Sequence, residues 1–244
     1  MSDIVRAGAY EIPVLYEDNH LLVVVKPANL PTQADSSGDD DLLSILKRYI
    51  GEKYNKPGAV YLGLVHRLDR PVGGVMVFAR TSKAASRLSE TFRTHEQDRR
   101  YLAVAEGEIA RDTELTDYLF KDGKTGMVRV VKKDFPGGKQ ARLITRPLKC
   151  REGLTLTHVQ LFTGRAHQIR VQHAHAGHPL WGDMRYGHGK PGRQIALWAY
   201  SLKIDHPTRH EALTFSARPP MTGAWKLFEA EICSRIQEEA CPDA

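Results

Sequence analysis

The alternation of apolar and polar residues in the first fifth of the chain predicts a hairpin followed by a helix. A polar turn at residues 17–19 interrupts the apolar stretch 12–26, which predicts two antiparallel strands. A soluble connector, 33–41, follows. Apolar residues with helical spacing then predict a helix over 42–50, and we expect Gly51 to end it.

The rest of the chain alternates between predicted strands and a few helices. Segments 60–65 and 74–79 have the composition of strands, and the second is apolar on both faces, which is typical of a central strand. Ser82 is expected to cap an amphipathic helix. Further strands are predicted at 101–105, 141–145, 154–162 and 195–204, a helix at 167–176 with Gly177 just past its end, and a last element at 225–232.

Strands joined by short turns outnumber helices, which favours an α+β fold over regular βαβ winding. We expect a mixed, mostly antiparallel central sheet with helices packed around it. With 244 residues, 41% of them hydrophobic and 26% charged, the chain has ordinary globular composition. A single domain over residues 1–244, with a core at about 12–232, is the expected organisation.

Composition also bears on location and partners. The longest aliphatic run, 21–25, is far shorter than the roughly 20 residues of a membrane span, and the first residues lack a secretory signal. We therefore expect a cytoplasmic protein, with Cys150, Cys233 and Cys241 as reduced thiols. The net charge of +6 suits a polyanionic partner, but charge balance alone does not establish one.

Two polar clusters stand beside predicted strands. Residues 66–70 (H-R-L-D-R) lie between two strands, where a rigid sheet would present them; the plain alternative is a turn whose aspartate bonds nearby amides. Residues 163–170 (T-G-R-A-H-Q-I-R) lie at a strand-to-helix junction that suits an anion, or they form an ordinary helix start. Arg170 has apolar neighbours, and a partly buried guanidinium needs an anionic partner.

A histidine cluster raises the alternative of a metal site. His173, His175 and His178 have the spacing H-x-H-x-x-H, as in some zinc hydrolases. Those enzymes have an aspartate where Gly177 stands, and imidazoles two residues apart on a helix point to different faces. We therefore expect no metal, with some of these histidines bonded to core carbonyls.

Taken together, the motifs resemble those of the RluA family of RNA pseudouridine synthases over about residues 14–215. They occur in the family's order: H-R-L-D at 66–69, R-Y at 100–101, T-G-R-A-H-Q-I-R at 163–170, and H-P-L-W-G-D with Y-G at 178–187. The opening 22–27 resembles the family's N-K-P element with Val25 in place of Asn. The resemblance implies the pseudouridine synthase fold around a catalytic cleft.

Two departures from the family pattern bear on this expectation. The aspartate motif usually continues with Thr-Ser-Gly, whereas this chain has Val72-Gly73-Gly74 and lacks two hydroxyls near the catalytic loop. This change bears on rate and substrate range and not on the reaction type. Many relatives also carry an N-terminal S4-like RNA-binding domain. Because about ten residues precede the first predicted strand, we expect a catalytic domain without that module.

The resemblance implies isomerisation of uridine in RNA through Asp69, the family's essential aspartate. It would act as an ionised carboxylate, either as a nucleophile at C1′ or C6 or as a base on a sugar proton. Arg170 matches the arginine that pairs with this aspartate, and Tyr101 matches the tyrosine that stacks on the uracil. The plain alternative for Tyr101 is a strand tyrosine packed in the core. No cofactor or metal is implied.

The resemblance also implies RNA contacts. Arg67 would fill the gap left by the flipped nucleotide or contact a phosphate, and His66 would brace the loop. The other expected phosphate contacts are Lys26, Arg99, Arg100, Lys132, Lys133 and Arg165. The partner is ribosomal or transfer RNA, with no membrane and no obligatory protein partner. A catalytically weak RNA-binding factor on the same fold, and a metal-dependent hydrolase built on the histidines, remain the alternatives.

Overall fold

The computed structural model describes residues 3–94 and 97–240, and its chain divides into two compact units. Unit 1 comprises residues 1–98 and 201–217; unit 2 comprises 99–200 and 218–244. The predicted single domain over 1–244 stays a prediction. Of the three cysteines, Cys150 and Cys233 carry unpaired thiols, and Cys241 lies outside the described residues. Within that part of the chain, no helix is long and apolar enough to cross a membrane.

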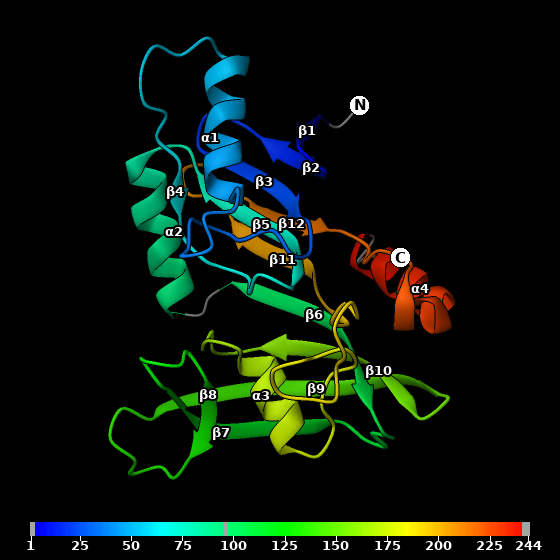
Figure 1. Ribbon diagram of the computed structural model, residues 1–244. Coiled ribbons are helices and arrows are strands. Elements are labelled where there is room, and N and C mark those ends of the chain that lie inside the picture. The colour runs from blue at the N-terminus through cyan, green and yellow to red at the C-terminus, as the bar shows by residue number, and fades with distance from the viewer. Residues whose placement is uncertain (1–2, 95–96, 241–244) are drawn as a thin grey trace. The chain divides into compact units, whose positions relative to one another are not determined.

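The elements follow one another as strands with a few intervening helices (Figure 1). Unit 1 contains β1 (Ile4–Ala7), β2 (Tyr10–Glu17), β3 (Leu21–Lys26), α1 (Leu42–Lys53), β4 (Gly63–Leu64), β5 (Gly73–Ala79), α2 (Ser82–Thr94) and β12 (Ala212–Ser216). Unit 2 contains β6 (Asp98–Glu106), whose first residue is assigned to unit 1, and β7 (Thr113–Lys121), β8 (Val128–Val131), β9 (Lys139–Arg151), β10 (Leu154–Leu161), α3 (Gln168–His175), the 3₁₀ helix η1 (Gly223–Phe228) and α4 (Glu229–Ala240). The strand β11 (Leu197–Asp205) passes from unit 2 to unit 1 after Tyr200.

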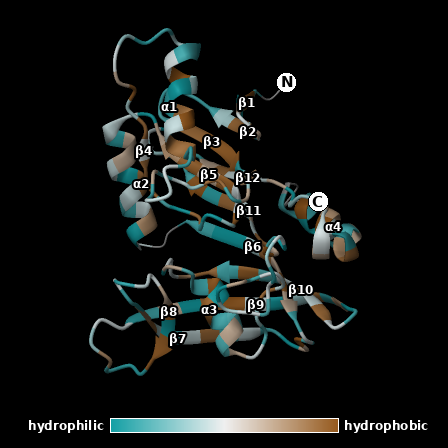
Figure 2. Cartoon of the chain, viewed as in Figure 1, coloured by the Kyte–Doolittle hydropathy of each residue, from teal (hydrophilic) through white to brown (hydrophobic). Residues whose placement is uncertain are grey.

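The sheet of unit 1 has the order β1-β2-β3-β5-β11, with β12 beside β11 and β4 beside β5. β3 and β5 are antiparallel, and their register places Lys26 opposite Gly74. Every residue of β5 is buried, as predicted for a central strand, and Figure 2 shows the apolar character of β3 and β5. On one face, Leu88 and Phe92 of α2 pack against these strands. This core holds the ends of β3 and β5 rigidly together.

The sheet of unit 2 has the order β11-β6-β10-β9-β7-β8. β6 and β10 are antiparallel, with Tyr101 opposite Val159. Helix α3 covers β7, β8 and β9, and its Val171 packs on Leu119, Val128 and Ala141 (Figure 1). The α+β class predicted from the sequence describes both units.

Several boundaries differ from the predictions. α1 continues through Gly51 to Lys53, where the Lys53 ammonium reaches the Glu17 carboxylate at 2.9 Å, and this contact offsets the low helix propensity of glycine. α2 begins at Ser82, but the capping hydroxyl belongs to Thr81, which accepts from Ala84 N at 3.2 Å. The strand predicted at 60–65 is reduced to the two residues of β4.

Candidate active site

Asp69 lies on a tight turn between β4 and the start of β5. Its carbonyl accepts a hydrogen bond from Val72 N at 2.9 Å, which closes the turn. Leu68 and Val72 are buried, whereas Asp69 is partly exposed and Arg67 is exposed. The apolar residues therefore anchor the turn, and the polar ones are turned outward. Val72, which replaces the family's hydroxyl residue, serves as one of these anchors.

A buried lysine fastens this turn to the neighbouring strand. Lys26, the last residue of β3, is fully buried, and its Nζ donates to the carbonyls of Pro27 at 3.0 Å, Arg70 at 3.1 Å and Val72 at 2.7 Å. The three N–H donors of an ammonium are thus matched by three carbonyl acceptors, as burial of such a group requires. The predicted phosphate contact at Lys26 is wrong, because the side chain has no exposed surface.

Two further side chains, Thr32 and His66, also hold this part of the chain. The Thr32 hydroxyl donates to the Leu68 carbonyl at 2.9 Å. His66 Nε2 accepts from Val77 N at 3.1 Å, and its ring stacks on Phe92 with centroids 4.5 Å apart and planes 9° from parallel. The expectation that His66 braces the loop agrees with these contacts. Its predicted contact with RNA stays a prediction.

Lys26 and Asp69 are electrostatically linked. Burial lowers the pKa of Lys26 to about 7, while the Asp69 carboxylate opposes this shift by favouring the ammonium. The ammonium that fastens the turn is therefore stabilised by the carboxylate that the turn presents.

Unit 2 contains a second buried ionic arrangement. Arg170 of α3 donates from Nε and Nη2 to the two carboxylate oxygens of Asp183, each at 2.8 Å. The Asp183 side chain is fully buried and that of Arg170 is 7% exposed. This bidentate pair uses the Nε–Nη2 edge, one of the two edges of a guanidinium fork. The buried anionic partner expected for Arg170 within its own unit is thus Asp183.

Asp183 also organises the loop that follows it. One carboxylate oxygen accepts from the backbone N–H groups of Arg185 at 2.9 Å and Tyr186 at 3.2 Å. The hydrogen bonds and charge of Arg170 hold the pKa of Asp183 below its usual value, although burial opposes this. The Tyr186 hydroxyl then lies 2.6 Å from His167 Nδ1, at the start of α3. The motifs at 163–170 and 178–187 are therefore connected by the contacts of Arg170 with Asp183 and of His167 with Tyr186.

Comparison with known proteins identifies the family. Residues 20–175 match the family model described as RNA pseudouridylate synthase. The chain belongs to this family. Its relatives include the ribosomal large subunit pseudouridine synthases D of Nitrosomonas europaea, 31% identical over 88% of the chain and 64% of the relative, and of Yersinia pestis, 34% identical over 88% and 70%. The chain thus spans about two thirds of the length of these relatives.

A solved structure shows the same fold. The human RNA pseudouridylate synthase domain containing 4 superposes with a TM-score of 0.71 over 92% of each chain, at 21% sequence identity. The predicted pseudouridine synthase fold, its α+β class and the RluA-type family are therefore confirmed, and so is the enzyme class, an isomerase. The roles of individual residues stay predictions.

The remaining predicted residues of this pseudouridine synthase lie in unit 2. Tyr101 is 7% exposed in β6, and both its stacking role and its alternative as a core residue stay open. Arg99 lies against the T-G-R motif: a Cβ atom on Gly164 would lie 2.7 Å from Arg99 Nη1, so a side chain at this position would displace the guanidinium. Burial lowers the pKa of Arg99. The predicted pairing of Asp69 with Arg170 would join the two units and stays a prediction.

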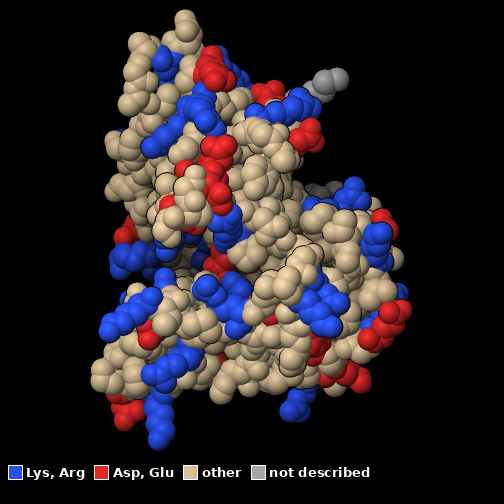
Figure 3. Space-filling view, viewed as in Figure 1, with Lys and Arg blue, Asp and Glu red and all other residues tan. Residues whose placement is uncertain are grey.

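Two other arginines contact protein groups within unit 2. Arg100 pairs with Glu239 of α4, and Arg165 Nε donates to the Gln140 carbonyl at 2.8 Å. Their predicted RNA contacts, and those of exposed Arg67, are untested. Figure 3 shows Lys and Arg side chains over much of the face in view, interspersed with Asp and Glu. On the face in view, basic side chains therefore do not form one uninterrupted patch.

Two histidines of the cluster, His173 and His178, are engaged by protein contacts. His173 Nδ1 donates to the Ile169 carbonyl at 2.9 Å, and its Nε2 lies 3.2 Å from the Thr145 hydroxyl. His178 Nδ1 donates to the Glu106 carbonyl at 3.1 Å. Within residues 3–94 and 97–240, no group of three or more His, Cys, Asp or Glu side chains could hold a metal ion. These engagements argue against the metal-hydrolase alternative.

Sequence reasoning missed the roles of three residues in these sites. Asp183 was part of a recognised motif, and a lone carboxylate within an otherwise apolar and glycine-containing stretch was the available signal. Lys26 at the end of a fully apolar strand was a similar signal. Nothing in the sequence pointed to Thr32, because its contact with Leu68 spans 36 residues.

Proposed function

We propose that this chain is an RNA pseudouridine synthase that converts specific uridines of ribosomal RNA to pseudouridine, with Asp69 as the reacting carboxylate. The observation that carries the proposal is the fixed turn around Asp69. The backbone carbonyls of residues 68, 69, 70 and 72 all accept hydrogen bonds from Thr32, Val72 N or Lys26. A carboxylate carried on a backbone held in this way has less freedom to lose when substrate arrives, as catalysis favours.

The reaction proposed for Asp69 is an isomerisation. The N1–C1′ bond of uridine breaks, the base turns, and a C5–C1′ bond forms, with no net transfer of electrons or phosphoryl groups. We infer that neither a metal nor an organic cofactor takes part. Asp69 acts in its ionised form, either as a nucleophile at C1′ or C6 or as a base on a sugar proton.

Arg170 completes the proposed site. Its Nε–Nη2 edge is committed to Asp183, so the guanidinium is fixed in one orientation. We propose that Arg170 pairs with Asp69, as the resemblance to the family implies. Asp183 is then a positioning residue, because it acts on Asp69 only through Arg170.

The target uridine must leave the base stack of the RNA before its reacting atoms can reach Asp69, and this unstacking costs a few kcal/mol. Tyr101 is proposed to stack on the flipped uracil, and Arg67, which is exposed beside Asp69, to occupy the vacated position or bind a phosphate. Ribosomal RNA is the favoured substrate because the relatives from Nitrosomonas europaea and Yersinia pestis are named for the large ribosomal subunit. Transfer RNA is the second candidate. We propose that the enzyme acts in the cytoplasm without an obligatory protein partner.

The proposal is tested by supplying the purified chain with RNA that lacks its modification. Ribosomal and transfer RNA from a strain without the gene are incubated with the protein, and pseudouridine is mapped at nucleotide resolution. We expect new pseudouridine at one or a few defined uridines. No new site in any RNA, with RNA binding retained, would leave only the RNA-binding alternative.

A further inference from the structure

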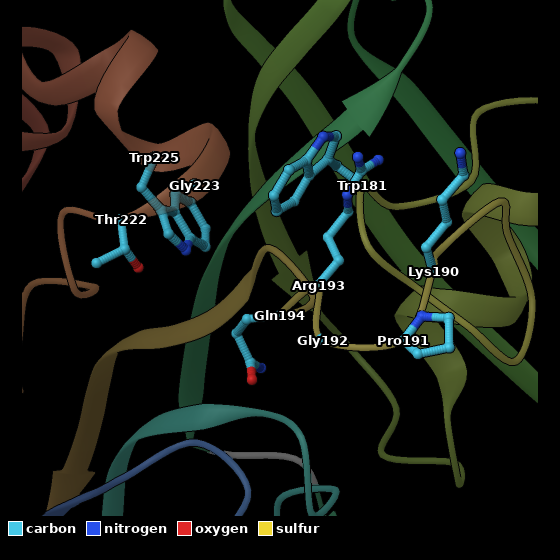
Figure 4. Close-up of a pocket in the computed structure, with 9 residues that line it drawn as sticks. All are labelled: Trp181, Lys190, Pro191, Gly192, Arg193, Gln194, Thr222, Gly223 and Trp225. Atoms are coloured by element: carbon cyan, nitrogen blue, oxygen red, sulfur yellow. The ribbon is translucent and has the colours of Figure 1, made fainter.

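Unit 2 contains a pocket of about 520 Å³ that the proposed chemistry does not use (Figure 4). Its walls come from the loop 190–194, the segment 222–225 and the indole of Trp181. The residues that line it are Trp181, Lys190, Pro191, Gly192, Arg193, Gln194, Thr222, Gly223 and Trp225. Its volume lies within the roughly 300–1,000 Å³ typical of sites for small ligands.

The Trp181 indole is fixed in this pocket. The backbone N–H of Trp181 donates to the Val104 carbonyl at 2.8 Å, and the backbone carbonyl of Trp181 accepts from Ala196 N at 2.9 Å. A Cβ atom on Gly223 would lie 2.8 Å from Trp181 Cη2, so the ring edge packs directly on that glycine. Figure 4 shows the indole between the 222–225 segment and the 190–194 loop. The ring is therefore held in place before any ligand arrives.

A glycine brings the basic loop close to this ring. Gly182 has φ +78°, and a Cβ atom there would lie 2.5 Å from the Gln194 carbonyl oxygen. Only glycine permits this approach of the two backbones. It places the guanidinium of Arg193 5.0 Å from the centroid of the Trp181 ring. Aromatic surface and positive charge are thus adjacent within one pocket.

The lining favours an anion that carries a flat ring. Lys190 and Arg193 are exposed, Trp181 is partly exposed, and the nine lining residues include no Asp or Glu. Stacking of a nucleobase on an aromatic ring, combined with cations that bind the adjoining phosphate, is the usual arrangement for single-stranded nucleic acid. Stacking tolerates any base, because every base has a π face.

We propose that this pocket binds one unstacked nucleotide of the RNA substrate, distinct from the uridine that is isomerised. The base of this nucleotide stacks on the Trp181 indole, and Lys190 and Arg193 bind the phosphate of the nucleotide. The inference rests on the proposed function only in taking RNA as the ligand. It makes Trp181 and Arg193 specificity-determining residues for the RNA that flanks the target uridine.

The direct test uses an RNA that cannot be a substrate. A fluorescein-labelled oligoadenylate of about eight nucleotides contains no uridine, and its Kd is measured by fluorescence anisotropy at low salt. We expect Trp181→Leu and Arg193→Gln each to weaken binding by about tenfold, the lower part of the range for loss of one stacked base. Trp181→Phe, which keeps a ring, should stay within about threefold of the unaltered chain.

Arg111→Gln is the matched control, because Arg111 is also an exposed arginine of unit 2 and does not line this pocket. If Trp181→Leu and Arg193→Gln bind as tightly as Arg111→Gln, or the unaltered chain does not bind oligoadenylate at all, the pocket proposal is overturned. Arg193 is exposed, so its variant addresses the proposal even if Trp181→Leu does not fold.

Activity separates this proposal from the proposed function. On a modifiable RNA, Trp181→Leu and Arg193→Gln should raise KM by about tenfold with little change in kcat. An unchanged KM in both variants of an active enzyme overturns the pocket and leaves the proposed function standing. If the chain forms no pseudouridine but binds oligoadenylate through Trp181 and Arg193, the proposed function falls and the pocket stands.

Discussion

The Lys26 Nζ atom donates to the Val72 carbonyl at 2.7 Å, which ties the end of β3 to the turn that presents Asp69. The same ammonium also binds the carbonyls of Pro27 and Arg70. One buried cation therefore fixes both ends of the segment that follows the aspartate. The position of Asp69 should depend on this lysine more than on any exposed residue nearby.

Lys26→Met tests this dependence. The substitution keeps the length of the side chain but leaves three carbonyls without their donor, each of which costs about 1–3 kcal/mol when buried. We expect a loss of about 3 kcal/mol in the free energy of unfolding by urea, because burial of the methionine offsets part of the total. Turnover of the folded enzyme should also fall.

Lys203→Met is the control for this prediction, since Lys203 is exposed on β11 in the same unit. It should change the free energy of unfolding by less than about 0.5 kcal/mol. Equal stability of the two methionine variants would mean that Lys26 does not hold the turn.

Arg170→Met and Asp183→Leu should each be strongly destabilising. Either change leaves the other member of a buried ion pair uncompensated, which typically costs about 3–5 kcal/mol. The double variant Arg170→Met/Asp183→Leu removes both charges and should cost less than the sum of the two single losses. A double-mutant cycle by urea unfolding measures this coupling.

Arg185→Met is the matched control, because Arg185 is exposed and lies two residues from Asp183. It should leave stability within about 0.5 kcal/mol of the unaltered chain. Strict additivity of Arg170→Met and Asp183→Leu would contradict the pair as the source of the effect.

His173 should make the fold sensitive to acid. Burial lowers its pKa from 6.5 to about 4, so between these values the unfolded chain takes up a proton that the folded chain does not. The free energy of unfolding should therefore fall as pH drops through that window. His173→Gln should reduce the slope by about one proton, or roughly 1.4 kcal/mol per pH unit at most.

His175→Gln provides the comparison for the acid effect, because His175 is on the same helix but exposed. It should retain the slope of the unaltered chain between pH 6.5 and 4. The same slope in the His173 and His175 variants would show that His173 is not the responsible group.

The sequence predicted those elements whose apolar pattern was strong. β3 and β5 appeared within one or two residues of their observed bounds, and α2 begins where Ser82 was expected to cap it, because burial on one or both faces leaves a regular pattern. β7 and β8 were missed. Most residues of β7 are exposed or partly exposed, and within this strand only Leu119 is buried. The pattern of β7 therefore resembles that of a polar loop. Tertiary pairing with β9 stabilises β7 where its own composition does not.

The motif residues were predicted better than their supporting contacts. H-R-L-D and T-G-R-A-H-Q-I-R led to the family, which the comparisons confirm. Lys26 was expected to contact RNA phosphate as one of a set of basic residues. Its partners are instead backbone carbonyls, which the sequence does not display. The contact between Arg170 and Asp183 likewise depends on how the loop after α3 folds back.

The central claim is that the Asp69 carboxylate performs the chemistry and is not needed for RNA binding. The most direct measurement compares Asp69→Asn with the unaltered chain on the same modifiable RNA, with turnover and RNA Kd determined side by side. The account predicts that turnover falls by about 10³-fold or more while Kd stays within about threefold. Retained turnover, or a parallel loss of binding and turnover, would contradict it.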